Sequence, residues 1–343
     1  MEGNVLIMGA GHQGLAMAAH LTLTGEKVNL WNRTPENIDD VSASRVIHCK
    51  GAVNGTAQIE NVSSNIEDVI ANRIMVTTPA FAHKSIAKLI APLVSDDTLI
   101  ILNPGRTFGA EDFSRELVLS GCNSSPIIAE TQTIVYTCRR DAKNFVNIYA
   151  LKKNVLIATV NQQHLKTVLE GVPTCLKPFI LPAHSTVQTS IGNVGMILHC
   201  APVLLNIGWI EYDVADFKFY CDGISPGIAR FLEKMDDERI SVGKAMGYNL
   251  ETTVEWLKRS YGVSGTNLYE CIKNNKYYKD IYAPKNLDHR YISEDLPYGL
   301  VPLESAANYY DIPTPCVSTI IDIASIVMDV DYRKTGRKFS LLS

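Results

Sequence analysis

The chain lacks the features that mark disulfide-rich, metal-binding or nucleic-acid-binding proteins. Its eight cysteines are scattered along 343 residues, and no two of them form a Cys-x-x-Cys pair. This pattern indicates reduced thiols and gives no metal site. The formal net charge is only −4, which provides no electrostatic basis for binding nucleic acid or an anionic membrane. No secretory signal precedes the first expected strand, so we expect a cytoplasmic protein.

Long uninterrupted apolar runs, internal repeats and low-complexity segments are also missing. The most apolar late stretch, residues 194–210, contains His199, Pro202 and Asn206, so it is a poor candidate for a membrane span. It is better explained as a buried helix. The composition, 46% hydrophobic and 20% charged, is typical of globular proteins, and the length suits two domains.

The N-terminus carries the clearest motif. An apolar strand at residues 4–8 leads into Gly9-x-Gly11-x-x-Gly14, and a helix is expected at 12–24. Gly9 permits a tight turn, Gly11 lets the backbone approach a pyrophosphate, and Gly14 allows close helix–strand packing. The N–H groups and positive dipole end of the helix then face the phosphates. The predicted cofactor contacts in this motif are Gly9, Ala10, Gly11, His12, Gln13 and Gly14.

Strands and helices alternate through the first half of the chain. After the first unit, strands are expected at 27–31, 73–77, 98–102 and 126–129, with helices at 82–93 and 111–119. Such alternation predicts parallel βαβ units, and hence an α/β fold with a doubly wound Rossmann sheet. Between the second and third strands we expect a loop-rich region with turn signals at Gly51 and Asn54-Gly55. Further strand-like segments are 146–151 and 155–159.

The pattern changes after Pro182. From Val187 onward the sequence has almost entirely helical periodicity. We therefore predict a Rossmann NAD(P)-binding domain at 1–182 and an all-helical substrate and catalytic domain at 183–343.

The residues after the second strand bear on the choice of dinucleotide. NAD sites usually place an acidic residue there to bind the ribose 2′-hydroxyl, but this chain has Asn32-Arg33-Thr34. A guanidinium and a hydroxyl suit a 2′-phosphate, so NADP(H) is favoured. NAD(H) stays open, because Asn32 alone could bind its ribose. Thr78 and Pro79 follow a later strand and are further candidate cofactor contacts, although Pro also suits simple turns.

Two segments of the second half carry titratable groups in unusual places. His199 lies in an apolar helix three residues before Pro202, where the proline should kink the helix. Glu294 and Asp295 enter a Pro-x-Gly turn that leads into an expected helix at 300–310. Taken alone, a histidine on an apolar face is more often a satisfied core residue than a catalytic one, and an acidic residue at such a turn is more often a simple loop carboxylate.

Several segments together resemble the octopine/opine dehydrogenase family. They are the Rossmann motif, Asn103-Pro-Gly-Arg106, Ala129-Glu-Thr131, the Asn193…His199 element and the Glu294-Asp-x-Pro-x-Gly299 turn. The resemblance covers nearly the whole chain, and its two C-terminal elements are the more specific ones. It implies an NAD(P)H-dependent enzyme that condenses an amino acid with an α-keto acid, and it implies a catalytic pair of His199 and Asp295.

The chemistry of that reaction suits these residue types. Histidine titrates near neutrality, so it can donate a proton during hydride transfer and recover it in the reverse reaction. A carboxylate on its other ring nitrogen would fix the tautomer. Asn193 is a candidate substrate contact, and Arg106 or Arg139 could bind the substrate carboxylates. The identity of the amino acid stays open.

Two alternatives remain at this stage. One is an NADPH-dependent 2-keto acid reductase of the ketopantoate reductase-like or glycerol-3-phosphate dehydrogenase-like type. Such enzymes commonly use a lysine on the first helix of the second domain, and residues 187–210 contain none. The other is a non-catalytic NADP(H)-binding sensor. A homodimer through the apolar segment 317–328 is possible, although core burial explains that segment equally well.

Overall fold

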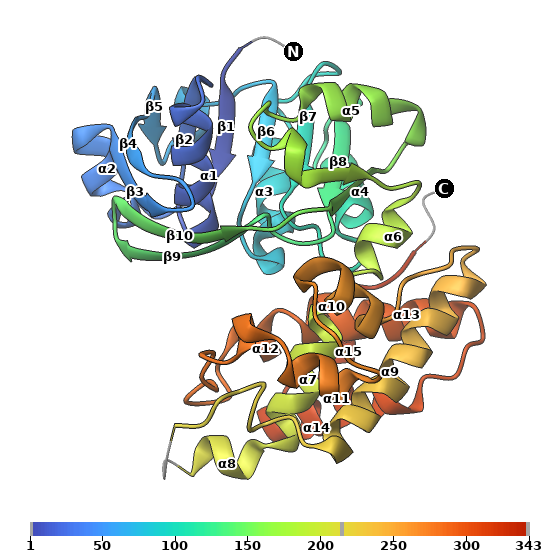
Figure 1. The fold of residues 1–343 in the computed structure, drawn as a ribbon. Helices are drawn as coiled ribbons and strands as arrows, with labels where there is room; N and C mark the ends of the chain where they lie inside the picture. Colours follow the sequence, from blue (N-terminus) through green and yellow to red (C-terminus); the bar gives the residue numbers. More distant parts are fainter. Residues whose placement is uncertain (1–2, 213–215, 341–343) are drawn as a thin grey trace. The chain divides into compact units, whose positions relative to one another are not determined.

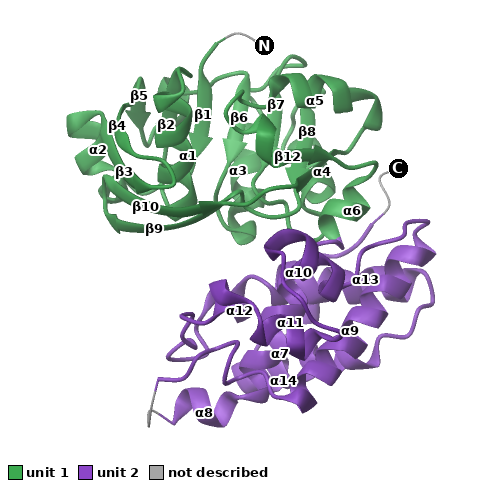
Figure 2. Ribbon diagram, in the orientation of Figure 1, with its two compact units in different colours: residues 1–190 green, residues 191–343 purple. Residues whose placement is uncertain are grey.

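The structure, a computed structural model, describes residues 3–212 and 216–340. It divides into two compact units, residues 1–190 and 191–343 (Figure 2). The division lies eight residues beyond the boundary expected at 182. The shift is explained by helix α6 (Thr186–Ser190), which packs on the sheet of the first unit and hydrogen-bonds to it through Thr189 and Ser190.

The first unit is built on an eight-stranded sheet with the order β12-β11-β8-β7-β6-β1-β2-β5. Neighbouring strands are parallel except for β11, which runs antiparallel to β8. The strands are β1 (Val5–Met8), β2 (Val28–Trp31), β5 (Asn61–Ser63), β6 (Arg73–Val76), β7 (Leu99–Leu102), β8 (Ile127–Thr131), β11 (Val155–Thr159) and β12 (Ile180–Pro182).

Both faces of this sheet are covered, which explains why its central strands are apolar throughout. Side chains alternate across a strand, so Val5 and Ile7 of β1 join one core with helix α1 (His12–Leu23). Leu6 and Met8 join a second core with helices α3 (His83–Ile90) and α4 (Gly109–Leu119). Figure 1 labels these strands and helices. The prediction of a doubly wound α/β fold is confirmed.

A second, four-stranded sheet was not predicted. Its order is β4-β3-β10-β9, and α1 packs against it. The loop expected between the second and third large-sheet strands instead contains a hairpin whose turn holds Asn54. Its strands have a polar, exposed side that weakens the apolar pattern. The strands are β3 (Val46–Gly51), β4 (Gly55–Gln58), β9 (Tyr136–Ala142) and β10 (Phe145–Leu151).

The second unit is helical, as predicted. Apart from a β-bridge between Lys218 and Tyr282, its described residues form no strand. The apolar stretch at 194–210 is divided at Asn206 into α7 and α8. The helices are α7 (Gly195–Leu205), α8 (Ile207–Glu211), α9 (Pro226–Ala245), α10 (Thr253–Tyr261), α11 (Leu268–Lys273), α12 (Arg290–Ser293), η7 (Leu296–Leu300, a π-helix), α13 (Val301–Tyr309), α14 (Pro315–Met328) and α15 (Tyr332–Thr335).

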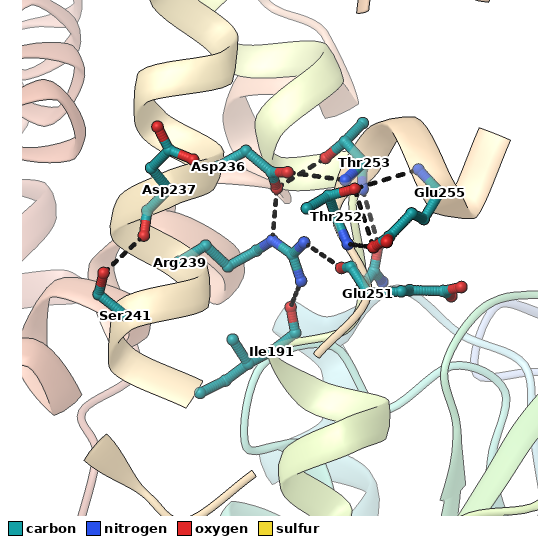
Figure 3. Close-up of polar contacts among 11 residues, drawn as sticks. Ile191, Asp236, Asp237, Arg239, Ser241, Glu251, Thr252, Thr253 and Glu255 are labelled. Atoms are coloured by element: carbon teal, nitrogen blue, oxygen red, sulfur yellow. Dashed lines mark hydrogen bonds and ion pairs between the residues drawn. The ribbon is translucent and has the colours of Figure 1, made fainter. Parts of the chain in front are cut away.

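A fully buried arginine joins helices of this unit. The guanidinium of Arg239 on α9 donates to Asp236 at 2.8 Å and to the carbonyls of Ile191 and Glu251 (Figure 3). Asp236 in turn accepts from the backbone and hydroxyl of Thr253, the first residue of α10. The network therefore fixes α9 to the start of α10 and to the start of the unit.

Candidate active site

His199 lies on α7 among apolar neighbours. Met196, Leu198 and Cys200 are buried, whereas the His199 side chain keeps 20% of its surface exposed. Its imidazole stacks on the ring of Tyr291, with centroids 4.1 Å apart and planes inclined by 15°. Stacking on Tyr291 therefore fixes the plane of the imidazole ring, while a fifth of the His199 side-chain surface stays accessible.

Asp295 approaches His199 from a segment 96 residues later in the chain. Its Oδ2 lies 2.9 Å from Nδ1 of His199, and the residue is 1% exposed. The backbone N–H of Asp295 bonds to the carbonyl of Arg290, a five-residue span, and the π-helix η7 follows. Such π-helical turns often occur at functional sites. The sequence predicted a turn at 297–299 before a helix at 300–310. In the structure this turn is the π-helix η7, which runs directly into α13.

The other nitrogen of His199 has a partner that the sequence did not indicate. Nε2 lies 3.1 Å from the hydroxyl of Tyr220, which is 3% exposed. Tyr220 belongs to the turn between the β-bridge at Lys218 and helix α9. Burial, with the neighbouring phenols of Tyr291 and Tyr278, raises the pKa of Tyr220 well above its usual value. The hydroxyl therefore stays protonated at neutral pH.

A second histidine lies near the pair. The ring of His289 contacts Tyr291 edge-on at 4.5 Å, and its Nδ1 accepts from the Tyr291 backbone N–H at the start of α12. Burial lowers the pKa of His289, and the charges of Arg290 and His199 lower it further. His289 is thus favoured in its neutral form, in which it caps the helix.

The glycine-rich turn in the first unit has the form of a dinucleotide cradle. Gly9 has a φ of +114°, and a Cβ on Gly14 would lie 1.7 Å from the Gly9 carbonyl oxygen. Helix α1 begins at His12 with no side-chain cap. Among the described residues, the buried Nε2 of Gln13 and Oγ1 of Thr78 have no hydrogen-bond partner. A helix start without a side-chain cap, with unpaired polar atoms on Gln13 and on Thr78 beside Gly9, fits a bound dinucleotide.

The residues after β2 lie beside this turn. Oδ1 of Asn32 accepts from the backbone N–H of Ala10 at 3.1 Å, and its Nδ2 donates to the Thr34 carbonyl. The Asn32 side chain therefore ties the end of β2 to the glycine-rich turn. Arg33 and Thr34 are exposed at the start of the following turn.

Arg140 also contacts the glycine-rich turn and was missed because strand β9 was missed. Its guanidinium donates to the carbonyls of Ala10 at 2.7 Å and Asn37 at 3.0 Å. Its backbone N–H donates to Nδ1 of His12 at 2.7 Å. The predicted Arg139 is exposed, and a period of two places it on the opposite face of β9. The structure thus brings Arg140 to the dinucleotide turn, whereas Arg139, which was predicted to bind a substrate carboxylate, is exposed on the other face of the strand.

The remaining predicted residues have varied environments. Asn193 is buried, and its Oδ1 accepts from the backbone of Gly195, where it helps to start α7. Arg106 is buried in the loop after β7 with a φ of +63°. Pro79 is exposed after β6. The described residues contain no cluster of three or more His, Cys, Asp or Glu side chains that could hold a metal ion.

A buried carboxylate at the end of β8 is a further feature. Oε1 of Glu130 accepts from the hydroxyls of Thr189 and Ser190, both at 2.7 Å, and Oε2 accepts from the N–H of Ala110 at 2.9 Å. Burial, with a smaller contribution from Glu111, raises the pKa of Glu130 to about 8. Glu130 belongs to the Ala129-Glu-Thr131 segment of the family resemblance, which predicts no role for it.

Two family models match the chain. The alpha-helical domain of NAD/NADP octopine/nopaline dehydrogenase matches residues 182–328, and ketopantoate reductase PanE/ApbA matches residues 5–123. The second match lies within the nucleotide-binding unit. The first covers α7 and the segment around Asp295, so it favours the opine dehydrogenase interpretation over the keto acid reductase. No helix in the described part of the chain is long and apolar enough to cross a membrane.

Whole-chain relatives agree with these matches. The opine dehydrogenase of Arthrobacter sp. (strain 1C) is 34% identical over 339 residues, which cover 98% of this chain and 94% of the relative. The solved octopine dehydrogenase with NADH and agmatine matches with a TM-score of 0.80 at 20% identity, covering 98% of this chain and 93% of that one. NADP⁺-bound yersinopine dehydrogenase gives 0.75 at 13% identity, covering 95% and 91%. The chain therefore belongs to the octopine/opine dehydrogenase family, which are NAD(P)-dependent oxidoreductases acting on CH–NH donors.

Proposed function

We propose that His199 and Asp295 are the acid–base pair of a reductive condensation between an amino acid and an α-keto acid. The observation that carries this proposal is the 2.9 Å contact between Nδ1 of His199 and Oδ2 of the buried Asp295. A carboxylate in that place holds the proton on Nδ1 and stabilises the imidazolium, so Nε2 is the nitrogen that exchanges protons with substrate.

In the reductive direction the amine and the keto acid condense to an imine with loss of water. The nicotinamide, when bound, supplies the hydride that reduces the imine carbon. His199 protonates the developing charge as the carbonyl or imine reacts, and its proton returns from solvent. In the oxidative direction neutral His199 removes the same proton. Asp295 keeps the ring oriented in both directions, and Tyr291 limits its rotation by stacking.

The preferred cofactor in this proposal is NADP(H). The residues that would hold the dinucleotide are those of the turn 9–14, with Asn32, Arg33, Thr34, Thr78 and Pro79. An amide rather than a carboxylate follows β2, and it bonds to Ala10. An exposed guanidinium stands next to it, so a 2′-phosphate would meet positive rather than negative charge.

Substrate contacts in the proposal are Asn193, Arg106 and Arg139. Each amino acid or keto acid brings a carboxylate, which a guanidinium binds through two parallel N–H···O bonds. Arg106 follows β7 at the carboxyl end of the sheet, the edge at which doubly wound folds bind ligands. A cytoplasmic location and a homodimer remain predictions.

A screen of substrates tests the proposed activity. NADPH oxidation is followed with each amino acid in combination with pyruvate and other α-keto acids, and products are identified by mass. The proposal expects a secondary amine whose mass is the sum of both substrates less one oxygen. A bare 2-hydroxy acid as product would instead indicate a keto acid reductase. Absence of turnover across the panel, with NADPH bound, would favour a sensor.

A further inference from the structure

The nitrogen of His199 that the proposed function requires is held by a tyrosine. Nδ1 faces Asp295, so proton exchange with substrate must use Nε2, and Nε2 lies 3.1 Å from the Tyr220 hydroxyl. That hydroxyl is buried, and its ring stacks on Tyr278 with centroids 4.0 Å apart. The phenol is therefore placed rigidly at the reacting nitrogen.

A hydroxyl can serve both protonation states of the imidazole, because it is a donor and an acceptor. With neutral His199, the Tyr220 hydroxyl donates to the Nε2 lone pair. With charged His199, Nε2–H donates to the Tyr220 oxygen, and the phenolic proton turns away. The phenol oxygen of the neighbouring Tyr291 is an acceptor for that proton.

The two hydrogen bonds differ in strength. A bond from the imidazolium to the phenol oxygen is charge-assisted, whereas a bond from the phenol to neutral imidazole is not. Charge-assisted bonds are the stronger class, by roughly a factor of two. Tyr220 therefore stabilises the charged ring more than the neutral ring, in the same sense as Asp295.

We infer that Tyr220 is a positioning residue of the acid–base pair. In the enzyme without substrate it holds Nε2 of His199 in both protonation states and favours the protonated one, and it releases Nε2 to the substrate for proton transfer. This inference rests on the proposed function for its catalytic meaning, although the effect on His199 itself does not. Tyr220 would act through His199 and would need no contact with substrate.

The other charged groups near His199 are accounted for. Asp295 contacts the ring, while His289 and Tyr291 face it from α12. Removal of the Tyr220 hydroxyl leaves the contacts of Asp295 and His289 in place. The elements packed against α7 carry further titratable groups. Three sets are ion-paired: Asp236 with Arg239 on α9, Arg290 with Glu294 around α12, and Asp322 of α14 with Arg333. The others are Tyr298 in η7 and the exposed Glu211 of α8.

The test compares Tyr220→Phe with Tyr278→Phe. The control removes a hydroxyl from the same aromatic cluster, and Tyr278 stacks on Tyr220. The pKa of His199 is measured by NMR in full-length protein with labelled histidine, and its resonance is assigned by its loss in His199→Gln. Tyr220→Phe should lower the pKa by about half to one pH unit, and Tyr278→Phe should leave it unchanged.

Turnover gives an independent second measurement. The high-pH limb of reductive kcat/KM and the low-pH limb of oxidative kcat/KM should both move to lower pH in Tyr220→Phe, because both report the same imidazole. An unshifted His199 pKa in Tyr220→Phe, or an equal shift in Tyr278→Phe, would overturn the inference. Undiminished turnover by His199→Ala would instead refute the proposed function, while the NMR result would still decide the role of Tyr220.

Discussion

Each of the two units buries a carboxylate, and the two differ in their partners. Asp295 in the helical unit is 1% exposed and lies against an imidazole that can carry a charge. Glu130 in the nucleotide-binding unit is fully buried, and the groups that bond to it are two hydroxyls and one backbone N–H, all of them uncharged.

The difference shows that burial alone does not identify a catalytic acid. The hydrogen bonds described above to the Glu130 oxygens come from uncharged donors. Burial raises the pKa of Glu130 to about 8, so its protonated form is favoured at neutral pH. A Cβ on Gly105 would lie 1.9 Å from Oε2 of Glu130, which shows how closely the chain surrounds this side chain. Asp295 has a partner that gains and loses a proton, which is what catalysis requires.

The largest effect is expected from Asp295→Asn. The amide can donate to Nδ1 of His199, which would move the ring proton to Nε2 and leave the wrong tautomer. We expect kcat to fall by about 10²- to 10⁴-fold, with the affinity for NADPH unchanged. Steady-state kinetics and fluorescence titration with NADPH measure the two quantities. A kcat close to that of the unmodified protein would remove Asp295 from the pair.

A third buried carboxylate, Asp236, is paired with the permanently charged guanidinium of Arg239, and Arg239→Met tests this pair. It leaves Asp236 buried without its guanidinium and removes donors from the carbonyls of Ile191 and Glu251 (Figure 3). The free energy of unfolding should fall by about 3–5 kcal/mol, measured by urea unfolding. Ser241→Ala on the same helix is the control, with an expected change within about 0.5 kcal/mol. Equal stability of the two variants would contradict this account.

Glu130→Gln tests the neutral environment of Glu130. The folded-state pKa of about 8 lies above the usual value of 4.5, so the stability linked to its proton is complete below pH 4.5. That stability is lost as the pH rises to about 8, with a slope of at most about 1.4 kcal/mol per pH unit. The variant should flatten the dependence of unfolding free energy on pH between 5 and 8. An unchanged slope would show that Glu130 is ionised in the folded protein.

The smallest effect is expected on cofactor affinity, from substitution of the charged Arg33 that follows the neutral Asn32 after β2. Arg33→Ala should weaken NADPH binding by about tenfold and leave NADH binding nearly unchanged, because NADH lacks the 2′-phosphate. Isothermal titration with both cofactors measures the difference. The exposed Arg230→Ala on α9, a residue with no proposed role in binding, is the control. Equal losses for the two cofactors would indicate that Arg33 does not recognise the phosphate.

The parts of the fold that could be predicted are those with strong periodicity. The buried strands of the large sheet and the helical second half have such patterns. The small sheet does not, because its strands expose polar side chains such as Lys50 and Thr56. Arg140 was missed for the same reason, since only a strand through 136–142 separates its side chain from that of Arg139.

The site could be predicted only where a motif marked it. His199 and Asp295 lie in two recognisable segments, and the structure brings them together over 96 residues of chain. Tyr220 lies in a turn with no motif, so its approach to Nε2 depends on tertiary packing alone. Glu130 lies within a motif, but the two hydroxyls that bond to it come from α6, a segment that sequence periodicity places in the other domain.

The most direct test of the central claim is the turnover of His199→Ala with the amino acid and keto acid that the unmodified protein uses best. Product is quantified by mass, and NADPH affinity is measured on the same preparation. We predict that secondary-amine formation is lost while the affinity for NADPH stays nearly the same. Continued formation of that product at an undiminished rate would contradict the account.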